Sequence, residues 1–160
     1  MIVKESQNMN ILFVCTGNTC RSPMAEGIAR VLGQEKGMNV VTLSAGLFAA
    51  YGAKVSPEAV EAVKDLVDIS EHESRPIQME FVNAADLIIG MTEEHKKVLL
   101  RQFPSMEQKI KTLAEWGGGS DDVADPYGQS QEVYNACAKQ MTQLIDAGLD
   151  ATKAQGMGLC

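Results

Sequence analysis

The sequence predicts an α/β fold, in which a four-stranded parallel sheet lies between two layers of helices in a single domain. The chain has 160 residues, close to the common size of one domain. Short continuous apolar runs, typical of strands buried on both faces, alternate with segments whose apolar residues recur at helical spacing. This alternation favours parallel strands joined by helical crossovers. The predicted strands are residues 11–14, 40–43, 86–91 and 110–113.

Capping residues mark where the predicted helices begin. Pro23 suits the first turn of a helix that follows the first strand. Ser56 caps a second helix, expected to run to about Val67, and Thr92 caps a third that continues through Leu100.

The last predicted helix presents one apolar face. That face consists of Val133, Cys137, Met141, Leu144 and Ile145. Residues 151–160 are expected to form a frayed tail, and residues 1–9 to be an extension ahead of the domain. The single domain is thus expected to account for the whole chain of residues 1–160.

Composition excludes several classes of function. A net charge of −7 and a pI near 4.8 argue against a duplex nucleic-acid partner, which requires clustered basic residues. No apolar run approaches the ~20 residues that span a bilayer, and no secretory signal begins the chain, so we expect a cytoplasmic protein without a membrane partner. We also expect a monomer. The four cysteines are expected as free thiols, and His72 and His95 in solvated or capping roles; no metal is expected.

The segment that follows the first strand carries the chemistry. It reads Cys15, Thr16, Gly17, Asn18, Thr19, Cys20, Arg21, Ser22, and it leads directly into a helix. Inward-facing backbone N–H groups and a helix N-terminus together favour a bound dianion. Arg21 can hold two phosphoryl oxygens at once, and the positive field should lower the pKa of Cys15 and make it a nucleophile. The lysine of a nucleotide-binding loop is absent, so neither nucleotide nor magnesium is expected as a cofactor.

Residues 14–26 closely resemble the signature of the low-molecular-weight protein-tyrosine-phosphatase family. Residues 44–46, 85–91 and 125–127 fall in the order and at about the spacings seen in that family. The resemblance implies that Cys15 forms a phosphocysteine intermediate while Arg21 and the loop amides hold the oxygens. It implies that Asp125 is the general acid and that Asn18 and Ser22 support the loop and the thiolate.

Other residues receive roles from the same resemblance. Cys20 is implied as a second thiol that forms a reversible disulfide with the nucleophile. Phe48, Tyr51 and Tyr127 are candidates for the walls of the entrance, although an aromatic residue in a loop is as often simple packing.

Within the family two substrates stand open, phosphoarginine and phosphotyrosine. Tyrosine-directed members typically have a bulky aliphatic residue where Thr19 stands, and often two successive aromatic residues after the proline of the acid loop. This chain has Thr19, and Tyr127 is followed by Gly128, as in the bacterial protein-arginine phosphatases that it resembles most. The sequence therefore favours phosphoarginine in proteins, with phosphotyrosine as the alternative.

Two further alternatives come from other classes of protein. An arsenate reductase would use a related loop, but it needs a relay of cysteines, and here only Cys137 and Cys160 follow Cys20. A phosphate-binding module would not need a nucleophile and an acid together.

Overall fold

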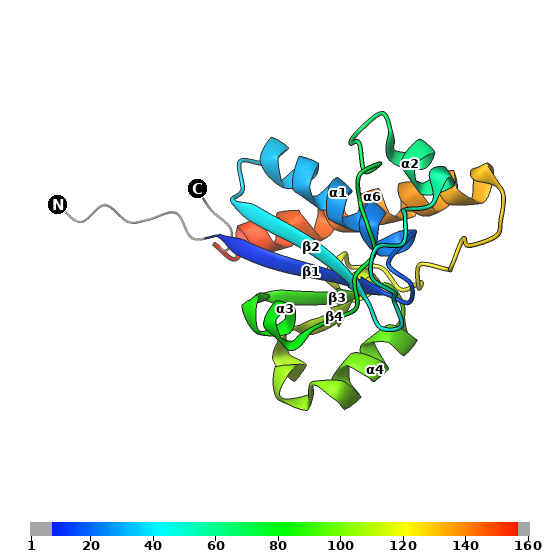
Figure 1. Cartoon of the computed structure of the whole chain (residues 1–160). Coiled ribbons are helices and arrows are strands. Elements are labelled where there is room, and N and C mark those ends of the chain that lie inside the picture. The colour runs from blue at the N-terminus through cyan, green and yellow to red at the C-terminus, as the bar shows by residue number, and fades with distance from the viewer. Residues whose placement is uncertain (1–7, 157–160) are drawn as a thin grey trace.

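The sheet has four strands, and every neighbouring pair is parallel (Figure 1). The computed structural model describes residues 8–156. Along the sheet the order is β2-β1-β3-β4. The strands are β1 (Met9–Cys15), β2 (Val40–Gly46), β3 (Leu87–Gly90) and β4 (Ile110–Thr112). The predicted α/β fold with a four-stranded parallel sheet is confirmed.

Strand β1 lies inside the sheet and is buried on both faces. Its alternate residues Ile11, Phe13 and Cys15 join one hydrophobic cluster. Leu12 and Val14 point the other way and join a second cluster. This two-sided burial explains why the strand reads as a continuous apolar run rather than an alternating one.

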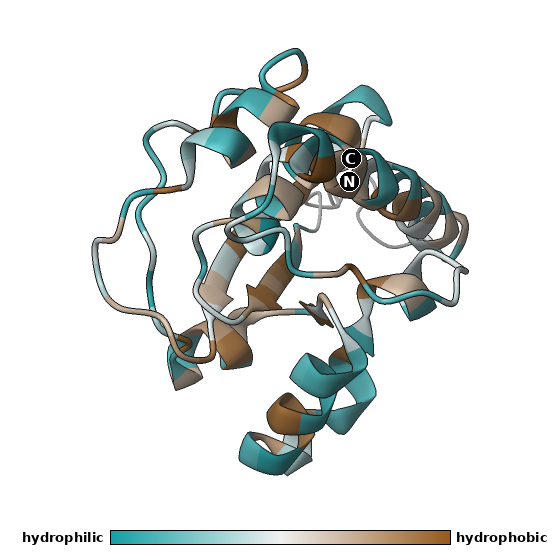
Figure 2. Cartoon of the chain, turned by 90° about the vertical axis from the view of Figure 1, so that its right-hand side faces the viewer, coloured by the Kyte–Doolittle hydropathy of each residue, from teal (hydrophilic) through white to brown (hydrophobic). Residues whose placement is uncertain are grey.

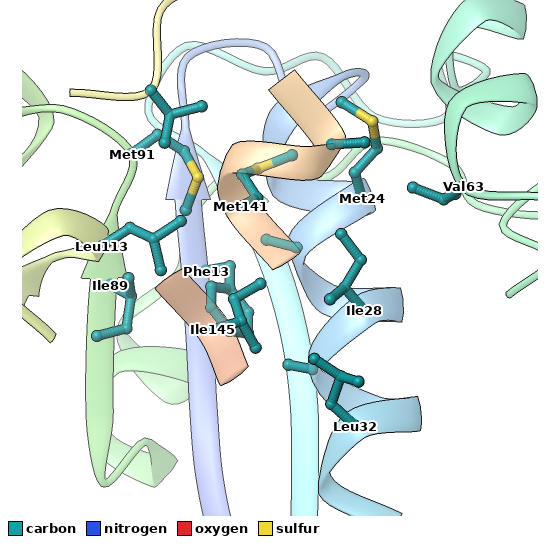
Figure 3. Close-up of a cluster of buried hydrophobic side chains, with 14 of the residues drawn as sticks. Phe13, Met24, Ile28, Leu32, Val63, Ile89, Met91, Leu113, Met141 and Ile145 are labelled. Carbon is teal, nitrogen blue, oxygen red and sulfur yellow. The ribbon is translucent and has the colours of Figure 1, made fainter. Parts of the chain in front are cut away.

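Helices cover both faces, which gives the predicted three layers (Figure 1). One face is covered by α1 (Arg21–Glu35), α2 (Pro57–Val63), α5 (Leu113–Trp116) and α6 (Gln131–Ala154), and the other by α3 (Met79–Ala84) and α4 (Glu93–Gln102). A short 3₁₀ helix, η1 (Pro104–Lys109), leads into β4. Figure 2 shows hydrophobic residues concentrated on the strands, whereas α4 is largely hydrophilic. Figure 3 shows the larger core, in which side chains of β1, α1 and α6 meet.

Helix α2 ends at Val63, four residues earlier than predicted. The backbone N–H of Lys64 bonds to the carbonyl of Glu61, which tightens the chain into a turn. The turn lets Val67 pack against Gly27 of α1, where an added Cβ would lie 3.0 Å from a Val67 methyl. Val67 therefore follows the helical spacing only by coincidence. It packs against α1 from the loop that comes after α2.

Helix α6 continues to Ala154, so the predicted frayed tail is wrong for residues 151–154, and residues 155–156 form an exposed turn after the helix. Thr152 is buried, accepts a hydrogen bond from Trp116 Nε1 at 3.0 Å and donates one to the carbonyl of Gly148. This anchor holds the last turns of the helix against the core. Residues 157–160, the rest of the predicted tail, lie outside the described residues.

Two other sequence predictions also need correction. Val133 was expected on the buried face of α6 but is 38% exposed, and the neighbouring Tyr134 is buried in its place. Met9 was expected in an extension ahead of the domain but is the buried first residue of β1. Residues 1–7 of that predicted extension lie outside the described residues.

Candidate active site

The loop of residues 15–22 leaves the carboxyl end of β1 and enters α1, where sheets of this kind bind ligands. It surrounds a cavity of about 210 Å³. The lining consists of Cys15, Thr16, Gly17, Asn18, Thr19, Cys20, Arg21, Asp125 and Tyr127. The fold therefore brings these predicted site residues together, and Asp125 and Tyr127 reach them from more than 100 positions further along the chain.

Asn18 holds the turn of this loop. Its φ of 57° is in the left-handed region, which is uncommon for a residue other than glycine. The side-chain Oδ1 accepts a hydrogen bond from the backbone N–H of Arg75. The amide group is thereby oriented so that Nδ2 donates to Ser22 Oγ at 2.8 Å and to Ser44 Oγ at 3.0 Å. These contacts from a fully buried side chain hold the strained turn in place.

The Cys15 sulfur lies 2.8 Å from Ser22 Oγ, and both groups are buried. Since Ser22 Oγ accepts the hydrogen bond from Asn18, its own hydrogen is free to point at the sulfur. Burial raises the pKa of the Cys15 thiol, whereas the hydrogen bonds from Ser22 and the charge of Arg21 oppose that rise. The predicted lowering of this pKa is therefore not found, because the depth at which the sulfur is buried cannot be read from a sequence.

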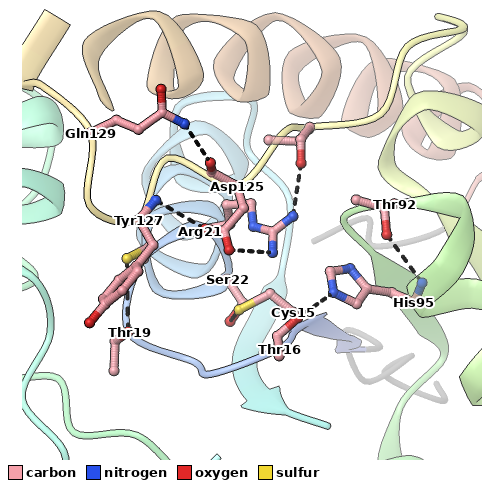
Figure 4. Close-up of polar contacts among 12 residues, drawn as sticks. Cys15, Thr16, Thr19, Arg21, Ser22, Thr92, His95, Asp125, Tyr127 and Gln129 are labelled. Atoms are coloured by element: carbon pink, nitrogen blue, oxygen red, sulfur yellow. Dashed lines mark hydrogen bonds and ion pairs between the residues drawn. The ribbon is translucent and has the colours of Figure 1, made fainter. Parts of the chain in front are cut away.

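Arg21 is buried and connects the loop to the segment that carries Asp125 (Figure 4). Its Nη1 donates to the carbonyl of Val123 at 2.9 Å, and its Nη2 lies 3.8 Å from Asp125 Oδ2. The backbone N–H of Val123 in turn bonds to the carbonyl of Met91, the residue that follows β3. The segment that carries Asp125 is thus held at Val123, two residues before Asp125.

Asp125 and Tyr127 form the outer side of the cavity. The Asp125 side chain is 57% exposed, and its Oδ1 accepts the backbone N–H of Tyr127. Gln129 Nε2 donates to the Asp125 carbonyl, and Gly128 takes a positive φ of 76° that completes the turn. Of the three candidate aromatic residues, Tyr127 lines the cavity, whereas Tyr51 lines a neighbouring cavity of about 720 Å³ and Phe48 lines neither of these two cavities.

Cys20 lies deeper than Thr19 in the same loop. Its sulfur is 3.8 Å from Thr19 Oγ1 and 3.3 Å from the hydroxyl of Tyr134, a residue of α6. Cys15, Cys20 and Cys137 are free thiols, and Cys160 lies outside the described residues. Burial raises the pKa of Cys137 to about 11.

Both histidines contact the loop, and the predicted solvated role is wrong for His95, which is buried. Nε2 of His72 lies 3.0 Å from the carbonyl oxygen of Asn18. Nε2 of His95 lies 2.9 Å from Thr16 Oγ1. No local pattern marked these residues, because each meets the loop from more than 50 positions away.

Neither a metal centre nor a membrane span is found in the part of the chain that the structure describes. Within residues 8–156, no three His, Cys, Asp or Glu side chains are grouped as metal ligands. Over the same residues, no helix is both long enough and apolar enough to cross a bilayer.

A buried cysteine in an anion-binding loop, with an arginine beside it and a carboxylate at the mouth, defines the class of cysteine-dependent phosphatases. The chain belongs to the low molecular weight phosphotyrosine protein phosphatase family, whose model matches residues 10–156. Its relatives in this family are hydrolases that act on phosphorylated proteins.

Three relatives illustrate the range of names within the family. A protein-arginine-phosphatase from Bacillus subtilis is 41% identical over 138 residues, which are 86% of this chain and 92% of that protein. A low molecular weight protein tyrosine phosphatase from T. tengcongensis has a TM-score of 0.86 and 43% identity, with 89% and 99% of the two chains covered. A YwlE arginine phosphatase mutant with a phosphorylated active-site serine has a TM-score of 0.86 and 38% identity, with 91% and 96% covered.

Proposed function

We propose that this enzyme removes phosphate from phosphoarginine side chains of proteins, by way of a phosphocysteine formed on Cys15. The observation that carries the choice of substrate is the position of Thr19, which stands in the wall of the cavity beside the loop. The names of relatives support it, since protein-arginine phosphatases from two species are about 40% identical to this chain.

In the first step the Cys15 thiolate attacks phosphorus. An S–P bond forms and the P–N bond to the arginine side chain breaks, while Asp125 delivers a proton to the leaving nitrogen. Arg21 and the backbone N–H groups of the loop hold the three phosphoryl oxygens and offset their charge. The exposed carboxyl of Asp125 lines the same cavity as Cys15, which supports this role.

In the second step water attacks the phosphocysteine. The Asp125 carboxylate accepts a proton from that water, the S–P bond breaks, and inorganic phosphate and the Cys15 thiolate are released. The relative with a phosphorylated serine in its active site supports a covalent intermediate of this kind. Neither step draws on a metal or a nucleotide.

Thr19 and Tyr127 shape the part of the cavity that the leaving group enters. Thr19 is β-branched and therefore stiff, and its hydroxyl offers hydrogen bonds to a flat, polar guanidinium group. An aliphatic residue there would favour an aromatic ring instead. The tyrosine alternative keeps support from the 43% identical relative that is named a tyrosine phosphatase.

The test is kcat/KM on paired phosphoarginine and phosphotyrosine peptides of the same sequence, since this ratio compares binding of the two transition states. Wild type is expected to prefer phosphoarginine, and Thr19→Ile to shift the preference toward phosphotyrosine. Thr19→Ser is the matched control, because it keeps the hydroxyl, and Cys15→Ser supplies the inactive blank. A wild-type preference for phosphotyrosine would replace the arginine proposal with the tyrosine alternative.

We further propose that Cys20 protects the nucleophile, by condensing with a sulfenic acid on Cys15 to give a disulfide and water. Mild peroxide, which supplies the oxidant, should then inactivate the enzyme reversibly. Mass spectrometry should find the two cysteines joined in wild type, and irreversible sulfinate on Cys15 in a Cys20→Ser variant. Sulfinate in wild type as well would contradict this role.

The working form that we propose is a cytoplasmic monomer. Light scattering of the purified protein tests the oligomeric state, and cell fractionation tests the compartment. A dimer that persists at nanomolar concentration, or recovery in the membrane fraction, would overturn these two parts of the proposal separately.

A further inference from the structure

His95 is a buried histidine for which the proposed reaction has no use. It lies in the first turn of α4, where its backbone N–H bonds to Thr92 Oγ1, and its side chain is 6% exposed. The ring reaches the phosphate loop, with Nε2 at 2.9 Å from Thr16 Oγ1. Figure 4 shows this pair on the side of Cys15 away from Thr19 and Tyr127.

The surroundings of the second ring nitrogen, Nδ1, determine which of the two nitrogens carries the hydrogen. Nδ1 of His95 is buried and has no hydrogen-bond partner among the described residues. A hydrogen on Nδ1 would leave a buried N–H without an acceptor, which is rare and costly. The hydrogen therefore belongs on Nε2.

The ring is also neutral at the pH of the cell. Burial, and next the positive charge of Arg21, lower the pKa of His95 to about 4. The charges of Asp122, Asp125 and Glu94 act in the opposite direction but do not outweigh these two causes. His95 thus keeps one hydrogen and the same tautomer wherever Cys15 can act.

These constraints fix the hydroxyl of Thr16. Because Nε2–H donates to Thr16 Oγ1, the hydroxyl cannot turn its own hydrogen toward the ring. Thr16 is an exposed residue that lines the cavity next to Cys15, so this hydrogen is available on the cavity side. A phosphoryl group offers only acceptor oxygens at physiological pH, and such a donor matches it.

We propose that His95 is a positioning residue, which orients the Thr16 hydroxyl as an additional hydrogen-bond donor to the phosphoryl group bound over Cys15. The inference rests on the proposed function, because it assigns the cavity to a phosphoryl group. The Thr16 hydroxyl would be a side-chain donor on the wall opposite Thr19. It would act together with the backbone N–H groups of the loop and with Arg21.

The affinity for inorganic phosphate tests the proposal without requiring turnover. Calorimetric titration in the Cys15→Ser background should show phosphate binding weakened about 10- to 100-fold by Thr16→Val, as expected for the loss of one hydrogen bond to a charged group. His95→Asn, which removes the donor near Thr16, should weaken binding similarly. Thr16→Ser and His95→Gln, which keep a hydroxyl and a donor respectively, should retain most of the affinity.

The double variant Thr16→Val/His95→Asn is the decisive member of the series. If His95 acts through Thr16, the double variant binds phosphate no more weakly than Thr16→Val alone. Losses that multiply would mean that His95 acts independently of Thr16 and would overturn the proposal. Thr152→Val is the matched control, since it removes a buried hydroxyl far from the loop and should lower the melting temperature without changing phosphate affinity.

Nitrogen-15 NMR of the wild-type imidazole tests the tautomer directly, even if a variant fails to fold. The expected spectrum shows hydrogen on Nε2, none on Nδ1, and no titration between pH 5 and 8. Hydrogen on Nδ1, or a ring that titrates in that range, would refute the inference. A wild-type enzyme that binds phosphate in this pattern but hydrolyses no phosphopeptide would instead refute the proposed function alone.

Discussion

Replacing Ser22 with alanine should suppress the thiolate of Cys15 while leaving the loop in place. In the structure the Ser22 hydroxyl is 2.8 Å from the sulfur, and Asn18 Nδ2 occupies its acceptor side, so its hydrogen points at the sulfur. This hydrogen bond opposes the effect of burial, which raises the pKa of the thiol. Its removal should therefore raise that pKa further.

The expected size follows from the kind of bond that is lost. A hydrogen bond to a charged group contributes roughly 1.5–3 kcal/mol, and 1.4 kcal/mol is a factor of 10 in an equilibrium constant. At a fixed neutral pH, the ratio of thiolate to thiol in Ser22→Ala should fall by about 10- to 100-fold. The loss of turnover should be at least as large, because the same bond also stabilises the thiolate as it leaves in the second step.

The rate of alkylation by iodoacetamide measures this ratio, since only the thiolate reacts. Ser22→Ala should be alkylated more slowly at neutral pH, and the rate should recover as the pH is raised. Ser44→Ala is the control: it removes the other hydroxyl bonded to Asn18 but leaves the bond to sulfur intact, so its effect should be smaller. Unchanged alkylation in Ser22→Ala, together with lost turnover, would refute the assigned role of the hydroxyl.

Three further outcomes are expected. Asp125→Asn should slow cleavage of substrates with poor leaving groups by about 10²–10⁴, and cleavage of activated aryl phosphates much less. Stopped-flow turnover of both substrate types measures the two effects. Equal losses would mean that another residue is the acid. Gly148→Ala should lower the free energy of unfolding by about 1–3 kcal/mol in urea titrations, because a Cβ there overlaps the Trp116 ring; unchanged stability would contradict the close packing. The pKa of His95 falls from 6.5 to about 4 on folding, so the unfolded chain binds a proton at a higher pH than the folded chain does. The free energy of unfolding should therefore decrease by up to about 3 kcal/mol as the pH drops from 6.5 to 4. Urea titrations over this range should show a smaller decrease in His95→Gln.

The sheet and the chemistry-bearing loop could be predicted because both leave local signals. Strands buried on two faces produce apolar runs, and the loop brings its glycine, arginine and cysteine together within a few positions. Short helices leave almost none: α3 has six residues and α5 has four, too few for a helical period to be recognised. Lys109, which donates to the carbonyls of Val82 and Ala85, stabilises the end of α3 from a distant segment.

Contacts between distant segments account for the other differences at the site. Nothing near His72 or His95 indicates that their rings reach the loop, since both contacts depend on how segments distant in sequence are arranged in space. The pKa of Cys15 depends on the balance between burial and hydrogen bonds, and a sequence shows the donors but not the depth of the sulfur. Residue types could thus be assigned to the site from the sequence, whereas their protonation could not.

The hydrogen bond from Arg21 to the Val123 carbonyl means that no single substitution of this arginine is a clean experiment. Arg21→Ala removes a charge from the cavity, but it also leaves a buried carbonyl without its donor and frees the segment that carries Asp125. Two separate failures would then appear as one loss of rate. Even Arg21→Lys, which keeps the charge, could contact only one of the two partners at a time. An inactive variant at this position would therefore identify an essential residue without revealing which of its two contacts the reaction needs.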